Sequence, residues 1–136
     1  GYAQVRQLHY GYLDMNWHSL TALPEESAME FEHKVLAPYA VMPSVDGTGF
    51  STSFSHIFSG GYSAGYYSYK WAEVLEADAF SLFKEKGIFN QEVSKSFREN
   101  ILSKGGSEDA SVLYRNFRGH DPEPQALMEK LGLIRK

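Results

Sequence analysis

Apolar side chains recur at helical spacing over most of this chain. Near the start they stand three and four residues apart, with polar residues between them, at Val5, Leu8, Tyr12 and Met15. A stripe of this kind is typical of an amphipathic helix and predicts one from about residue 3 to residue 20. A weaker helical pattern follows between Glu25 and Pro38, and the prolines on either side of it limit this second helix to a short one.

The sequence after residue 65 predicts four more helices. The first has the most regular stripe of the chain, at Ala72, Leu75, Ala79, Leu82 and Phe83. Glycines, which commonly end helices, follow the four stretches at Gly87, Gly105, Gly119 and Gly132. Ser107 precedes the third stretch and is its expected N-cap, because a serine hydroxyl can accept a backbone N–H.

The two halves are joined by a segment of turns and phenylalanines. The sequence MPSVDGTG at residues 42–49 predicts a loop. Phe50, Phe54 and Phe58 then fit either a helix or an alternating strand, and we expect a short helix. Because neither a paired set of strands nor a long linker is evident, the expected fold is all-α, with residues 1–136 as one helical unit.

Charge and composition exclude several classes of partner. The chain has a net charge of -4 and no cluster of Lys and Arg, which argues against nucleic acid and anionic membranes. No apolar run approaches the roughly 18 residues of a membrane span. The chain has 0 cysteines, so disulfide and thiolate chemistry are excluded and a cytoplasmic location is favoured.

Tyrosine and glycine are concentrated in HIFSGGYSAGYYSY, residues 56–69. Tyr62, Tyr66 and Tyr69 are four and three residues apart, so a helical segment would place their hydroxyls on one side and Tyr67 elsewhere. Phenols stay protonated at neutral pH and can donate hydrogen bonds to a carbonyl or a developing oxyanion. The alternative is that the rings pack in a core and the hydroxyls contact water or backbone.

The sequence gives less support to a metal site, a nucleotide-binding loop or a serine hydrolase site. The five histidines form no H-E-x-x-H motif, and Asp14 with His18 would supply only two metal ligands, so we expect a structural hydrogen bond between them. The glycine-rich segments lack the Lys-Ser/Thr of a phosphate-binding loop and the G-x-S-x-G of a serine hydrolase. Arg115 and Arg118 fit either a substrate carboxylate or salt bridges between helices.

Three stretches resemble the thimet oligopeptidase, oligopeptidase A and peptidyl-dipeptidase Dcp family of zinc metallopeptidases. They are RQLHYGYLDMNWHSL from Arg6 to Leu20, SFSHIFSGGYSAGYYSYKWAEVLEADAF from Ser53 to Phe80, and ILSKGGSEDASVLYRNFRGHDPEPQALMEKLGL from Ile101 to Leu133. The resemblance implies the carboxyl-terminal helices of a large, two-lobed helical peptidase. Its zinc would be bound by H-E-x-x-H upstream, so zinc is an expected cofactor with no ligand among these residues.

The family pattern H-x-x-x-G-G-Y-x-x-x-Y-x-x-Y can be carried over residue by residue. It falls on His56, Gly60, Gly61, Tyr62, Tyr66 and Tyr69. The resemblance implies that these residues bind the peptide substrate, with Tyr62 and Tyr69 stabilising the oxyanion. Whether the parent enzyme cuts internally or releases dipeptides stays open.

Two functions remain as hypotheses. The chain begins without Met, and we interpret it as part of a longer peptidase that is inactive without the remainder of the parent chain, its expected partner. The alternative is a non-catalytic helical module that binds a peptide or small ligand through the tyrosine-rich loop. A part of a larger protein should expose an apolar face on its first helix, whereas an independent module should have a closed core.

Overall fold

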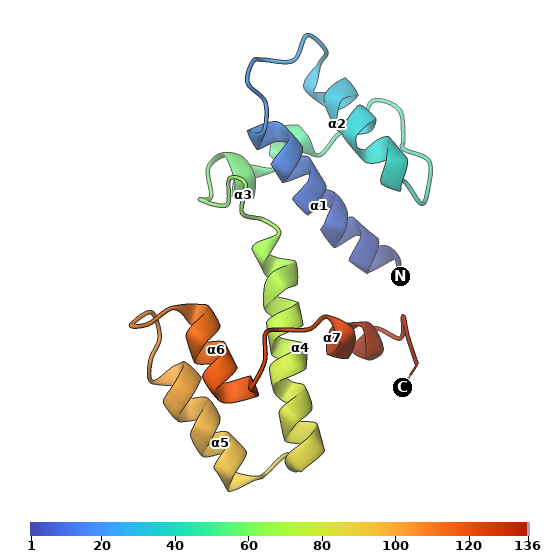
Figure 1. Cartoon of the computed structure of the whole chain (residues 1–136). Helices are drawn as coiled ribbons and strands as arrows, with labels where there is room; N and C mark the ends of the chain where they lie inside the picture. The colour runs from blue at the N-terminus through green and yellow to red at the C-terminus, as the bar shows by residue number, and fades with distance from the viewer. Residues whose placement is uncertain (136) are drawn as a thin grey trace. The chain divides into compact units, whose positions relative to one another are not determined.

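The computed structural model describes residues 1–135, and every regular element in this range is helical (Figure 1). The all-α class expected from the hydrophobic pattern is confirmed. The chain divides into two compact units, Gly1–Lys70 and a second one that begins at Trp71. Within residues 1–135, no helix has the length and apolar character needed to cross a bilayer.

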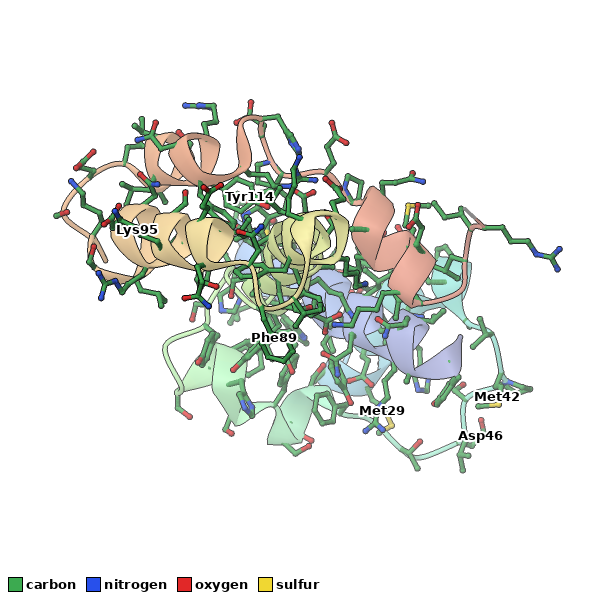
Figure 2. The ribbon with its side chains drawn as sticks, turned by 90° about the horizontal axis from the view of Figure 1, so that it is seen from below. Met29, Met42, Asp46, Phe89, Lys95 and Tyr114 are labelled. Carbon is green, nitrogen blue, oxygen red and sulfur yellow. The ribbon has the colours of Figure 1, made fainter. Side chains whose placement is uncertain are left out.

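The first unit contains three α-helices and two short 3-10 turns. In chain order they are α1 (Tyr2–His18), α2 (Ala28–Leu36), η1 (Ala37–Tyr39), η2 (Ser51–Ser53) and α3 (Ser55–Phe58). A capping box starts α2, since the Ser27 hydroxyl accepts the backbone N–H of Glu30 and the Glu30 carboxylate accepts that of Ser27. The predicted loop follows η1, and Met42 and Asp46 lie on it (Figure 2).

The core of the first unit uses a face of α1 other than the apolar stripe identified in the sequence. Leu13 is buried with Phe54 and Ile57, and partly buried side chains surround them at Tyr10, Trp17, Val35, Leu36, Phe50 and Tyr66. Leu8 and Met15, from the predicted stripe, remain 47% and 43% exposed. The helix is confirmed, and the predicted stripe forms an exposed apolar face of α1 that lies outside the core of this unit. The buried face contains the charged residue Asp14, which weakens its hydrophobic pattern in the sequence.

A buried carboxylate fixes the end of the long loop in this unit. Glu32 on α2 accepts hydrogen bonds from the backbone N–H groups of Phe50, at 2.8 Å, and Ser51, at 2.6 Å. The Ser51 hydroxyl donates a third at 2.7 Å, and the indole of Trp17 donates to that same hydroxyl at 3.0 Å. These bonds satisfy a charge that would be costly to bury alone, and they hold the loop against the core.

Four helices, one of them extended by a π-helical turn, lie in the described part of the second half of the chain. They are α4 (Ser68–Lys86), α5 (Gln91–Phe97), its π-helical continuation η3 (Arg98–Leu102), α6 (Ala110–Arg118) and α7 (Gln125–Lys130). All four predicted helices are confirmed, but the N-cap of α6 is Asp109 rather than Ser107. The Asp109 carboxylate accepts the Ser111 N–H at 2.8 Å, so the helix begins later than expected.

Aromatic rings and one buried ionic network form the core of the second unit. The rings of Phe83, Phe97 and Phe117 meet in pairs, with centroids 5.1 to 6.3 Å apart. Tyr114 lies among the helices of this unit (Figure 2), and its hydroxyl donates to the carboxylate of Asp78 at 2.7 Å. Burial, followed by this contact with Asp78, raises the pKa of Tyr114 above its usual value.

The arginines considered as carboxylate binders form ion pairs within this unit. Arg118 is mostly buried and contacts Asp78 at 3.3 Å and the Ser81 hydroxyl at 2.9 Å. Arg115 contacts Asp121 at 2.6 Å. Both side chains therefore have structural partners on the protein itself.

Candidate substrate-binding site

The tyrosine-rich segment turns back on α3 and then leads into α4. After the short helix, the N–H of Gly60 donates to the carbonyl of Ser55 at 2.8 Å, and that of Tyr62 donates to the carbonyl of His56 at 3.1 Å. The Ser63 hydroxyl donates to the carbonyl of Ile57 at 2.6 Å. The loop is therefore tied to the carbonyl groups of α3, whose Ile57 side chain is fully buried.

Two adjacent glycines are required for different reasons. A Cβ at Gly60 would lie 2.9 Å from the Cα of His56 and 3.0 Å from its carbonyl oxygen, which is closer than packed atoms come. Gly61 has open space around it, but its backbone φ is +81°, an angle that residues other than glycine rarely adopt. Together they let the chain pass close to His56 and reverse direction before Tyr62.

The structure brings the rings of the four predicted side chains into one cluster. Tyr62 and Tyr69 stack with centroids 5.3 Å apart, and Tyr66 lies 4.9 Å from Tyr69. The His56 ring lies 6.0 Å from Tyr62 and 5.9 Å from Tyr66. Among the three tyrosines only Tyr69 is inside an α-helix, and His56 belongs to the short helix α3, so the cluster depends on the loop as well as on helical spacing. Tyr67 is 58% exposed, and no ring contact joins it to the cluster among the described residues.

Tyr66 and Tyr69 present neutral phenols, which can donate hydrogen bonds at physiological pH. Burial raises the pKa of Tyr66, and a side-chain hydrogen bond with Tyr62, followed by burial, raises the pKa of Tyr69. Tyr62 and Tyr69 are 36% and 41% exposed, so a ligand can reach them. A pair of accessible phenols beside an imidazole suits a ligand that carries backbone carbonyl groups.

Asp14 on α1 anchors this loop, and the sequence did not reveal that role. One carboxylate oxygen accepts the N–H of Ala64 and the other accepts that of Tyr66, both at 2.8 Å. His18 lies 2.8 Å from the same carboxylate, so the structural contact expected between these two residues is present. The loop contacts join residues about 50 positions apart, and no local sequence pattern indicates them.

The described residues do not fit a zinc ion. Both oxygens of Asp14 are occupied by backbone N–H groups, which leaves His18 without a second free ligand beside it. Within residues 1–135, no group of three or more His, Cys, Asp or Glu side chains is placed to hold a metal.

A large cavity in the described residues includes none of the residues of the tyrosine cluster. It has a volume of about 1040 Å³ and belongs to the second unit, where side chains of α4, α5 and α6 such as Phe80, Phe97 and Leu113 line it. Its lining is almost wholly apolar. The tyrosine cluster, with its imidazole and accessible hydroxyls, is therefore the better candidate for a site that binds peptide.

Comparison with known proteins identifies relatives over nearly the whole chain. The model of peptidase family M3 matches residues 1–133. Oligopeptidase A of Escherichia coli (strain K12) is 47% identical over 131 residues, which cover 95% of this chain and 19% of that protein. A dipeptidyl carboxypeptidase of Salmonella typhimurium is 39% identical over 99% of this chain and 20% of its own length. A probable cytosolic oligopeptidase A of Arabidopsis thaliana is 40% identical over 98% of this chain.

The chain therefore spans about a fifth of the length of these relatives. Their names agree with the family that the motifs resembled, and the matched range of the family model, residues 1–133, spans the segment that contains the glycine and tyrosine pattern. This chain belongs to peptidase family M3.

Proposed function

We propose that this chain is the substrate-binding, carboxyl-terminal part of a zinc metallopeptidase of family M3 that hydrolyses short peptides. The observation that carries the proposal is that the accessible rings of Tyr62 and Tyr69 and the imidazole of His56 meet in one cluster, although they come from α3, the loop and α4. When a peptide bond is attacked, negative charge develops on its carbonyl oxygen. Neutral phenol donors bind that oxygen more strongly in the transition state than in the substrate, and therefore accelerate the chemical step.

The other pattern residues are proposed to contact the peptide backbone or to shape the loop. His56 and Tyr66 contact the peptide backbone, and their rings, 5.9 Å apart, form one side of the cluster. Gly60 and Gly61 shape the turn that places Tyr62 and let the loop close on the substrate.

Zinc and the remainder of the parent chain are the cofactor and the partner in this proposal. The metal would be bound outside these residues, and the isolated chain would be inactive. The exposed Leu8 and Met15 on α1 support this interpretation, because an independent module would be expected to cover such a face. We place both compact units in one catalytic domain and the enzyme in the cytoplasm, as the name of the Arabidopsis relative suggests.

The test is a chimera in which this chain replaces the matching 131-residue segment of E. coli oligopeptidase A. Cleavage of a quenched fluorogenic peptide is measured with Tyr69→Phe and with Tyr62→Phe. Loss of one oxyanion donor is expected to lower kcat by roughly 100-fold, with a smaller change in KM. Tyr67→Phe is the matched control, since its ring lies outside the cluster.

Unchanged kcat in both cluster variants would contradict the oxyanion role. The isolated chain gives a second measurement, and it is expected neither to retain zinc nor to cleave the peptide. Tight binding of the peptide by the isolated chain, without metal, would instead favour the non-catalytic module.

A further inference from the structure

Asp14 is a fully buried charge whose hydrogen bonds lead to the tyrosine cluster. Its side chain is 0% exposed, although it lies on α1, far in the sequence from the loop. It accepts hydrogen bonds at 2.8 Å from Ala64 N–H and Tyr66 N–H, the residues on either side of Gly65. His18 approaches the same carboxylate at 2.8 Å. A buried carboxylate is costly unless its oxygens are hydrogen-bonded, so the pairing constrains the loop as strongly as it constrains Asp14.

The backbone between these two bonds has an unusual conformation. Ala64 has a φ of 54°, in the left-handed region that residues other than glycine seldom occupy. Such a conformation persists only when surrounding contacts hold it. The hydrogen bond that the Ala64 N–H donates to Asp14 is one such contact, and the bond that the Gly65 N–H donates to the Tyr62 carbonyl at 2.8 Å closes the same turn.

Tyr66 links this turn to the hydroxyls of the site. Its N–H is held by Asp14, and its ring contacts those of His56, Tyr62 and Tyr69. A shift of the Tyr66 backbone would therefore move the ring against which the other three pack. Because α4 begins at Ser68, the same shift would also alter the entry into the helix that carries Tyr69.

We propose that Asp14 is a positioning residue that fixes the conformation of the tyrosine loop in which Tyr62 and Tyr69 face the substrate. It acts through the backbone N–H groups of Ala64 and Tyr66 and does not touch the substrate itself. This inference rests on the proposed peptidase function. Besides the residues that bind the peptide and those that stabilise the oxyanion, the site then includes a residue on α1 that positions the loop.

The test uses Asp14→Asn in the chimera with E. coli oligopeptidase A. Asparagine has nearly the same shape but only one acceptor oxygen, so one of the two N–H groups would face the side-chain NH₂ group. Glu32→Gln is the matched control, because Glu32 is also a buried carboxylate that accepts backbone N–H groups, but those of Phe50 and Ser51. Both substitutions weaken a buried hydrogen-bond network, and only the first touches the tyrosine loop.

Asp14→Asn is expected to lower kcat by at least about tenfold, with a smaller change in KM, since displacing a positioned group by about 1 Å can cost on the order of 100-fold. Glu32→Gln should leave kcat within about twofold. The double variant Asp14→Asn with Tyr62→Phe should lose less than the product of the two single losses, because both act on the same hydroxyl. Brief treatment with chymotrypsin should cleave the Asp14→Asn protein faster at Tyr62 to Tyr69, with the sites identified by mass spectrometry.

Two results would overturn the inference while leaving the proposed function in place. One is an unchanged kcat in Asp14→Asn when Tyr62→Phe and Tyr69→Phe lower it. The other is a loss in the double variant equal to the product of the single losses, which would mean that Asp14 acts independently of Tyr62. If neither tyrosine variant lowers kcat, the proposed function fails. In that case the rate of chymotrypsin cleavage still tests whether Asp14 fixes the conformation of the loop. A rate unchanged by Asp14→Asn would overturn this inference too.

Discussion

Replacing Tyr114 by phenylalanine removes one hydroxyl from the core of the second unit and leaves the size of the aromatic ring unchanged. That hydroxyl donates to the Asp78 carboxylate at 2.7 Å, with the Leu75 carbonyl as a more distant acceptor at 3.4 Å. Asp78 is almost fully buried, so the lost bond is not replaced by bulk water. The substitution therefore isolates one charge-assisted hydrogen bond inside a low-dielectric core.

The expected loss of stability follows from the partners that remain. A hydrogen bond to a charged group contributes about 1.5–3 kcal/mol. Asp78 would keep its contact with Arg118 at 3.3 Å, so we expect about 2 kcal/mol for Tyr114→Phe. Asp78→Ala should cost more, about 3 kcal/mol, because it leaves the mostly buried guanidinium of Arg118 without that carboxylate.

Urea unfolding of the second unit measures these losses. Trp71 is the only tryptophan of that unit among the described residues, so a Trp17→Phe background lets its fluorescence report on this part of the chain. A loss of 2 kcal/mol should lower the urea midpoint by about 1 M. Tyr67→Phe, at an exposed position, controls for the change of residue type. If Tyr114→Phe unfolds at the same urea concentration as this control, the buried hydroxyl contributes no net stability and the reasoning is wrong.

Three further predictions concern pH, capping and packing. Because burial and Asp78 raise the pKa of Tyr114 above 10.0, the folded state favours the protonated phenol. The stability that this provides should be retained below pH 10.0 and lost as the pH rises further. In a pH series of urea midpoints, Tyr114→Phe should reduce this alkaline loss of stability. Ser27→Ala removes the N-cap of α2 and should lower the free energy of unfolding by about 1 kcal/mol, whereas an unchanged value would mean that the capping box is not formed in solution. Leu13→Ala should cost about 2–5 kcal/mol by chemical denaturation because Leu13 is buried, while Leu8→Ala should cost much less, and equal losses would contradict the assignment of the buried face.

Local features of the fold could be predicted from the sequence, and contacts between distant segments could not. Glycines and prolines marked the helix ends, because their backbone preferences act on their immediate neighbours. The spacing of Tyr62, Tyr66 and Tyr69 predicted that a helix would place their hydroxyls on one side. The structure brings their rings into contact, although part of the segment is a turn. Their role in binding peptide stays a proposal.

The buried face of α1 and the anchoring of the loop depend on long-range pairing. Asp14 is polar, so a hydrophobic pattern assigns it to the surface, yet it is buried because Ala64 and Tyr66 supply the N–H groups that satisfy its charge. Glu32 is buried for the same reason by Phe50 and Ser51. The backbone donors of both carboxylates lie far more than one helical turn away in the sequence, so hydrophobic periodicity carries no information about these pairs.

The different demands on Gly60 and Gly61 have a consequence for how variation at this loop should be interpreted. At position 60 any Cβ meets the backbone of His56, so a saturation library selected for a folded loop should return glycine alone. At position 61 the surroundings are open and only the positive φ is restrictive, so asparagine, which tolerates that region, should also be recovered. A search pattern that treats the two glycines as equivalent would therefore discard sequences able to form this turn, whereas G-[GN]-Y would retain them.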